Sequence, residues 1–138
     1  MPPPDLFASF SLLIYSLVWT MYSADMGKPT NPVPDLLPGT LYLLILRTLR
    51  AGPLHGYAIA RRIEEASADG LQIEEGSLYP ALNRMLVKGW LAADWGLSET
   101  NRRARFYRLT QEGRKQLERE ADTFSRLVIA IQRVMRTV

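Results

Sequence analysis

Two short stretches of this sequence carry side chains that could recognise a nucleic acid. Asn83 and Arg84 are adjacent, and these are the residue types that pair in bidentate fashion with adenine and guanine edges. Further along, the run 101–105 is rich in arginine, whose planar guanidinium suits phosphates and narrow minor grooves. The same residue types are also common on ordinary solvent-exposed helices and turns that bind nothing. The elements that position them therefore decide between the two interpretations.

The composition removes most catalytic chemistry. The 138 residues contain no cysteine and a single histidine, His55, so a catalytic triad or a His-based metal site would depend on that residue alone. His55 precedes a glycine at the start of a predicted helix, where a structural cap is favoured over a pH switch. We therefore expect no enzyme activity, no catalytic residue, no metal site and no cofactor.

The charge of the chain is unevenly placed. The chain has 17 Lys and Arg against 14 Asp and Glu, yet residues 1–25 hold no basic residue and two of the acids. The remaining residues thus have a net charge of +5 (17 − 12), and most of their basic residues are arginine. A sequence pI near 9.4 permits nucleic-acid binding without proving it. With 47% hydrophobic residues the chain should fold as one globular unit with an appendage.

Asn83 and Arg84 fall on the third of three predicted helices. Apolar spacing predicts helices over 36–49 and 56–66 and a short strand over 71–74. Ser77 would cap the third helix, with Pro80 in its first turn. One side of this helix is apolar, with Leu78, Leu82, Met85 and Leu86. The opposite side carries Ser77, Pro80, Asn83, Arg84 and Val87, and Tyr79 lies at the boundary, where its hydroxyl could reach a phosphate.

The arginine-rich run falls at the tip of a predicted hairpin. Two strand-like stretches, 90–95 and 104–109, flank a polar tip at 98–103. This order of elements is that of a winged helix-turn-helix over 36–110, a mostly α fold with a small β-hairpin, whose third helix enters the major groove of double-stranded DNA. The residues assigned to DNA contact are Ser77, Tyr79, Pro80, Asn83, Arg84, Lys88, Asn101, Arg102, Arg103 and Arg105.

The last predicted helix, within 111–138 and capped by Thr110, has the most regular apolar spacing in the chain. The spacing alternates between four and three residues, as in helices that pack against a partner helix. At about 1.5 Å per residue this helix is about 40 Å long, which outruns a small winged domain. We expect a homodimer on a pseudo-palindromic operator, with recognition helices roughly 34 Å apart. A helix that folds back on its own domain is the alternative. The predicted seam is Leu117, Ala121, Phe124, Val128, Ile131, Met135 and Val138.

Residues 1–35 form an N-terminal extension and linker. The segment 6–22 has no charge and is near the lower limit of roughly 17–25 residues for a membrane span, but several Ser and Thr interrupt it. A signal peptide requires a basic region before its apolar segment, and none is present here. Three interpretations stay open: an upstream extension if Met26 is the natural first residue, an accessory helix, or a membrane anchor. The anchor is the least favoured, so a cytoplasmic protein is expected.

Four ordered motifs resemble the PadR family of bacterial transcriptional regulators. They are LPGTL at 37–41, GPLHGYAI at 52–59, EGSLYPAL at 75–82 and RARFYRLT at 103–110, and the resemblance covers 36–138. It implies a winged-helix DNA-binding domain, a C-terminal dimerisation helix and, usually, repression of nearby genes. By position, residues 76–80 begin the recognition helix and Arg102 and Arg103 fall in the wing. The single final helix resembles the short-tailed branch of the family.

Other functions remain alternatives. A winged helix can serve as an adaptor that binds protein, and the segment 6–22 could tether a regulator to a membrane. Family members also sense small aromatic or cationic molecules, and Trp90 and Trp95 could line a site for such an unidentified effector. A tryptophan on a strand, however, is more often part of a core.

Overall fold

The structure is a computed structural model that describes residues 39–137. These residues fall into two units, 39–121 and 122–137, and helix α5 contributes to both. The predictions made for 1–35, for the start of the first helix and for Val138 lie outside the described residues. Among residues 39–137, no helix is both long enough and apolar enough to span a membrane.

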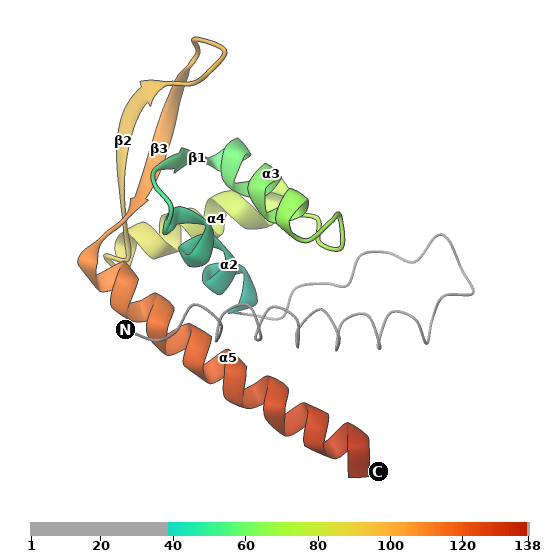
Figure 1. Cartoon of the computed structure of the whole chain (residues 1–138). Helices are drawn as coiled ribbons and strands as arrows, with labels where there is room; N and C mark the ends of the chain where they lie inside the picture. The colour runs from blue at the N-terminus through green and yellow to red at the C-terminus, as the bar shows by residue number, and fades with distance from the viewer. Residues whose placement is uncertain (1–38, 138) are drawn as a thin grey trace. The chain divides into compact units, whose positions relative to one another are not determined.

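The described elements are helix-rich with a small sheet, as the sequence predicts (Figure 1). In chain order they are α2 (Thr40–Leu49), β1 (Leu54–His55), α3 (Gly56–Ala66), α4 (Glu75–Val87), β2 (Leu91–Leu97), β3 (Arg103–Leu109) and α5 (Gln111–Thr137).

The three strands form one antiparallel sheet with the order β1-β3-β2. Strands β2 and β3 make a long hairpin whose tip projects beyond the helices in Figure 1. The N–H of Asn101 donates to the carbonyl oxygen of Ser98 at 2.9 Å, and Asn101 has a φ of 60°. Asparagine tolerates this left-handed conformation, so it suits the turn that reverses the chain. The tip is therefore one residue shorter than predicted, because Arg103 already belongs to β3.

The predicted strand over 71–74 is wrong, and the third strand is β1 instead. Leu71 and Ile73 do pack against the core, while Gln72 and Glu74 are exposed, so the alternation in the sequence is real. Within residues 39–137, however, no strand pairs with this segment. Both edges of β3 are already paired, one with β2 and the other with β1. Extended backbone without a ladder partner is not a strand.

Helix α4 begins earlier than predicted. Glu74, in an extended conformation, is the N-cap residue, and its carbonyl oxygen accepts from the N–H groups of Ser77 and Leu78 at 3.1 and 3.0 Å. Ser77 is thus inside the first turn and not the cap. Pro80 consequently lies in the second turn, where its ring nitrogen has no hydrogen to donate to the carbonyl oxygen of Gly76.

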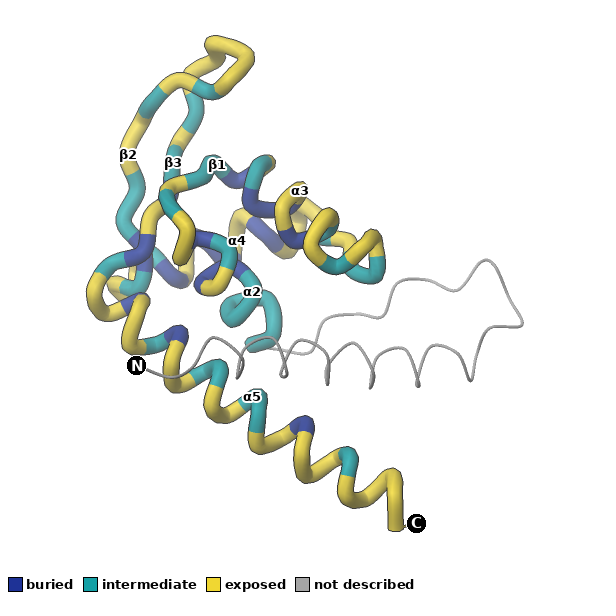
Figure 2. The backbone as a smooth tube through the Cα atoms, in the orientation of Figure 1, coloured by how far each residue is buried: buried dark blue, intermediate teal, exposed yellow. Residues whose placement is uncertain are grey.

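The core of the unit formed by residues 39–121 lies where three helices meet the base of the sheet (Figure 2). Its fully buried members, which set the spacing of α2, α3 and α4, are Ile45, Leu46, Leu49, Ile59, Leu78, Leu82 and Met85. The sheet adds Leu91, Tyr107 and Leu109. Leu117, the first residue of the predicted dimer seam, belongs to this same core. That part of the seam is therefore used within the chain.

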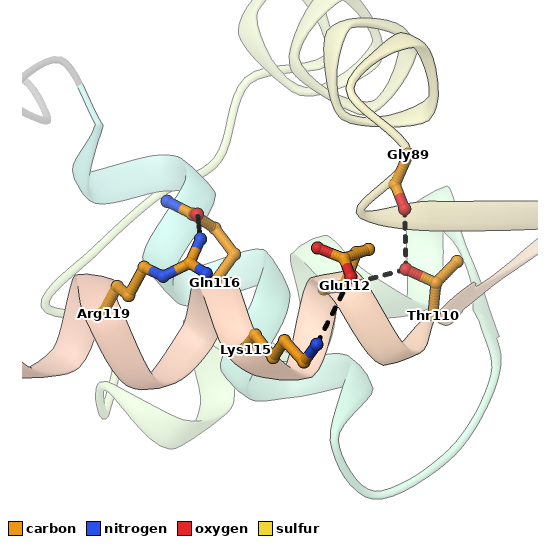
Figure 3. A network of polar contacts seen from close by, with 7 residues as sticks. Gly89, Thr110, Glu112, Lys115, Gln116 and Arg119 are labelled. Carbon is orange, nitrogen blue, oxygen red and sulfur yellow. Dashed lines mark hydrogen bonds and ion pairs between the residues drawn. The ribbon is translucent and has the colours of Figure 1, made fainter.

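Hydrogen bonds of Thr110 connect the start of α5 with the turn that follows α4 (Figure 3). Its hydroxyl donates to the carbonyl oxygen of Gly89 at 2.7 Å and accepts from the N–H of Gly113 at 3.0 Å. Its own N–H donates to the carbonyl oxygen of Trp90 at 3.1 Å. The prediction that Thr110 caps the last helix is confirmed. A Cβ atom on Gly113 would overlap the Trp90 carbonyl oxygen, so glycine is what allows this close crossing.

Candidate nucleic-acid interface

Four residues form the middle of the solvent-exposed face of α4. Gly76, Pro80, Asn83 and Val87 follow one another at spacings of four and three residues, so they lie on one face of the helix. The buried residues Leu78, Ala81, Leu82 and Met85 lie opposite. Val87 is 89% exposed, and Gly76 and Pro80 are small or compact. Asn83 is the one side-chain amide on this face. The small residues around it leave space for the edge of a base.

One flank of this face carries two cations that rest on aromatic rings. Nε of Arg84 donates to the hydroxyl oxygen of Tyr42 at 2.6 Å. Nζ of Lys88, one helical turn further, lies 5.0 Å from the centroid of the Trp90 ring. Tyr42 and Trp90 meet edge to face with 5.8 Å between ring centroids. The two aromatic rings therefore hold both cations beside the α4 face.

Tyr79 occupies the other flank, against the start of α3. A Cβ on Gly56 would stand 2.9 Å from the Tyr79 ring, so the ring lies directly against the Gly56 backbone. Burial raises the pKa of the Tyr79 hydroxyl, and nearby Glu75 and Tyr107 raise it further. Because tyrosine already ionises near pH 10, about three units above neutral, the hydroxyl stays protonated and can donate to a phosphate oxygen.

This contact gives a first test. Gly56→Ala should lower the free energy of unfolding by about 1 kcal/mol, because the added methyl group forces the partly exposed Tyr79 ring to move aside. In a Tyr79→Ala background the same change should cost much less. Chemical denaturation of the four proteins in this cycle measures the coupling. Equal costs in both backgrounds would show that the Tyr79 ring is not what Gly56 accommodates.

The hairpin continues the Tyr79 flank as a row of alternating arginines and aromatic rings. The guanidinium carbon of Arg103 lies 4.7 Å from the Trp95 ring centroid, and that of Arg105 lies 5.8 Å from the Tyr107 ring centroid. Trp95 and Arg105 are also paired across the two strands. Tyr107 is close enough to Tyr79 to influence its pKa, so the row begins beside α4. We call Tyr107, Arg105, Trp95 and Arg103 the wing row.

On the opposite face of the hairpin, the side chains contact other residues of the same chain. Arg108 lies 3.5 Å from the Asp94 carboxylate, and Phe106 packs edge to face against His55 with 5.5 Å between centroids. Nδ1 of His55 accepts from the N–H of Ala58 at 3.2 Å, which caps α3. The structural interpretation of His55 is confirmed. Among the described residues, the hairpin arginines that have no ion pair are therefore those of the wing row and the tip.

All residues assigned to DNA contact from the sequence are exposed. They lie on α4 and at its C-cap, or on the hairpin: Ser77, Tyr79, Pro80, Asn83, Arg84 and Lys88 in the first place, and Asn101, Arg102, Arg103 and Arg105 in the second. Their contacts with DNA stay predictions. Sequence reasoning missed Tyr42, because only the folded chain brings it to α4.

The two tryptophans have different surroundings. Trp90 packs against the core, whereas Trp95 is 63% exposed, so the expectation of a core role is wrong for Trp95. Its position explains this, since residue 95 lies in the second half of β2, whose residues are mostly exposed. Five residues of extended chain separate the two by about 16 Å. A site for a small effector at either tryptophan stays a prediction.

Helices α3 and α4 with the β2–β3 hairpin define a winged helix-turn-helix protein. The model of the transcriptional regulator PadR-like family matches residues 45–119, and the chain belongs to this family. The similar solved structures include the following two. A transcriptional regulator from Clostridium thermocellum has a TM-score of 0.66 and 28% identity, covering 72% of this chain and 97% of that one. A PadR family transcription regulator from Clostridium difficile has a TM-score of 0.61 and 27% identity, covering 69% and 97%.

Two relatives are similar in sequence. An uncharacterized 37.1 kDa protein in transposon TN4556 of Streptomyces fradiae is 45% identical over 85 residues, which is 62% of this chain and 23% of that protein. Protein X of Lysinibacillus sphaericus, also uncharacterized, is 29% identical over 83 residues, covering 60% and 76%. The chain thus spans less than a quarter of the Streptomyces protein. The family and the solved neighbours are transcription regulators rather than enzymes.

Proposed function

We propose that this chain is a dimeric, sequence-specific DNA-binding repressor. Helix α4 reads base edges in the major groove, and the hairpin contacts phosphates or the adjacent minor groove. The observation that best supports this proposal is the exposed face of α4, which has cations held against aromatic rings on both flanks. Arg84 and Lys88 rest on Tyr42 and Trp90 on one side, and the wing row extends the other. Asn83 at the centre is suited to an adenine edge.

A footprint tests the proposal. The full-length protein is added to the DNA upstream of its own gene at two salt concentrations. We expect a protected site with two-fold symmetry, whose affinity falls steeply between about 50 and 200 mM salt as phosphate contacts are lost. If a folded protein protects no DNA and selects no sequence from a random duplex library, the proposal is wrong. Salt-insensitive binding to a protein would favour the adaptor alternative.

The hairpin should contribute affinity without sequence preference. Arg102→Ala and Arg103→Ala should each weaken binding to every duplex by a similar factor and reduce the slope of log affinity against log salt by about one. Arg126→Ala is the matched control, since Arg126 is an exposed arginine of α5 that pairs with Asp122 at 3.2 Å. Gel shifts at several salt concentrations give the slopes. A loss confined to one sequence would instead assign base reading to the hairpin.

The dimer is proposed from α5. Its second half, 122–137, carries large apolar side chains that are exposed, among them Ile131 and Met135, and Met135 is 65% exposed. Val128 in the same half is buried, with 5% of its surface exposed, and Phe124 is half-buried. Apolar groups at a/d spacing on the outside of a long helix are suited to a second copy of the same helix.

Light scattering on the full chain tests the dimer. Wild type should have twice the chain mass of 15.7 kDa, and Ile131→Asp should shift the population toward one chain mass. The buried carboxylate would be unpaired in the helix pair, which makes association unfavourable. Arg126→Ala again serves as the control. A wild type of single-chain mass at micromolar concentration would contradict the dimer.

Repression is the remaining part of the proposal. It follows from the resemblance to the family, because a dimer on an operator next to a promoter blocks access to it. A reporter driven by the footprinted DNA should be less active when the wild-type chain is present. The variant Asn83→Ala should restore its activity. Higher reporter activity with the wild-type chain would show an activator.

A further inference from the structure

Tyr42 of α2 holds Arg84, the one arginine of α4, in a defined place. Its hydroxyl oxygen accepts from Nε of Arg84 at 2.6 Å, and the guanidinium carbon lies 5.8 Å from the centroid of its ring. The Tyr42 ring is itself fixed, because it meets the half-buried Trp90 at an interplanar angle of 80°. A line of contacts thus connects the core with an exposed guanidinium on the α4 face.

The hydrogen bond selects which donors of Arg84 remain for a ligand. A guanidinium has five N–H groups in a planar fork. Nε–H is bonded to Tyr42, so the four N–H groups on Nη1 and Nη2 remain at the outer end of the side chain. Such an end-on pair matches the two acceptors, O6 and N7, of a guanine edge. The side chain has also given up part of its rotamer freedom before DNA arrives.

We propose that Tyr42 is a positioning residue that sets the base preference of Arg84. Without this contact a long arginine can turn to a phosphate, which adds affinity and little specificity. With it, Nη1 and Nη2 are presented to one guanine of each half-site, and Tyr42 itself touches no base. This inference rests on the proposed reading of DNA by α4.

The test compares base preferences rather than affinity alone. Preferred duplexes are selected from a random library with the full-length wild type, Tyr42→Phe and Arg84→Ala. Tyr42→Phe keeps the ring against Trp90 and removes only the acceptor. Arg84→Ala should abolish a guanine preference of about 5- to 150-fold at one position of each half-site. Tyr42→Phe should reduce the preference at that same position by about three- to tenfold and leave the other positions unchanged.

Two further measurements separate positioning from a structural role. Tyr42→Phe should have no effect on base preference in an Arg84→Ala background, because it acts through that arginine. Tyr57→Phe, which removes the hydroxyl of an exposed tyrosine on α3, should leave the preference unchanged. Tyr42→Phe overturns the inference if it keeps the full guanine preference, weakens all positions equally, or adds to Arg84→Ala. A wild type that selects no sequence overturns the proposed function and this inference with it.

Discussion

Gly113→Ala will lower the free energy of unfolding by about 3 kcal/mol, because the added methyl group has no space. A Cβ at this position overlaps the Trp90 carbonyl oxygen and lies 3.2 Å from Cδ2 of Leu109. The overlap is with a backbone atom, so no side-chain rotation relieves it, and the start of α5 must shift away from the end of α4. For a domain of this size the unfolding midpoint should fall by roughly 12–24 °C.

Gly76→Ala is the matched control for this prediction. Nothing lies within 4 Å of a Cβ at Gly76, and alanine favours a helix by about 1 kcal/mol over glycine, so the control should lose no stability. Denaturant unfolding of the full chain, followed by circular dichroism, measures both variants. If Gly113→Ala unfolds at the same denaturant concentration as wild type, the close contact between the first turn of α5 and the Trp90 backbone is not as described.

Asn83→Asp will weaken binding to the selected DNA site by about 100-fold or more, the second large effect expected. The change replaces the amide, which can donate to adenine N7 while accepting from N6, with a carboxylate that only accepts. It also places a negative charge at the centre of the face that meets the phosphates. Asn83 is exposed and the two side chains have the same shape, so folding should be unaffected.

The control for Asn83→Asp changes the charge by the same amount elsewhere. Gln111→Glu introduces a carboxylate in the exposed first turn of α5, where the helix dipole favours an acid. It should alter affinity only slightly. Equal losses for the two variants in a gel shift would mean that net charge, and not base reading at Asn83, explains the effect.

Local periodicity accounts for what the sequence predicts correctly about the fold. The stripe that includes Leu78, Leu82 and Met85 identifies the buried side of α4, and the exposed side follows from it. Strand β1, by contrast, has two residues, too few for any periodicity, and exists only because β3 lies beside it. The segment 71–74 has the alternation of a strand without a partner. Pairing between distant segments decides both cases, and the sequence pattern does not contain it.

The same distinction applies to the candidate site. Asn83 and Arg84 are predictable from the helical wheel of α4 alone. The contact that holds Arg84 joins residues 42 positions apart, and nothing in either local sequence marks them as partners. Trp95 is similar, because nothing in the local sequence marks the second half of β2 as mostly exposed. Sequence patterns thus predict which residues face solvent on α4, and tertiary contacts determine how they are oriented.

The junction of α4 and α5 has a mechanical consequence. Its hydrogen bonds join Thr110 to the carbonyl oxygens of Gly89 and Trp90 and to the N–H of Gly113, which are all main-chain groups. Two of these bonds use the Thr110 hydroxyl, and the branched Cβ of threonine restricts the side-chain rotation that would break them. The end of α4 and the first turn of α5 therefore form a stiff corner rather than a hinge. A tilt of the first turn of α5 tilts the C-terminal end of α4 with it.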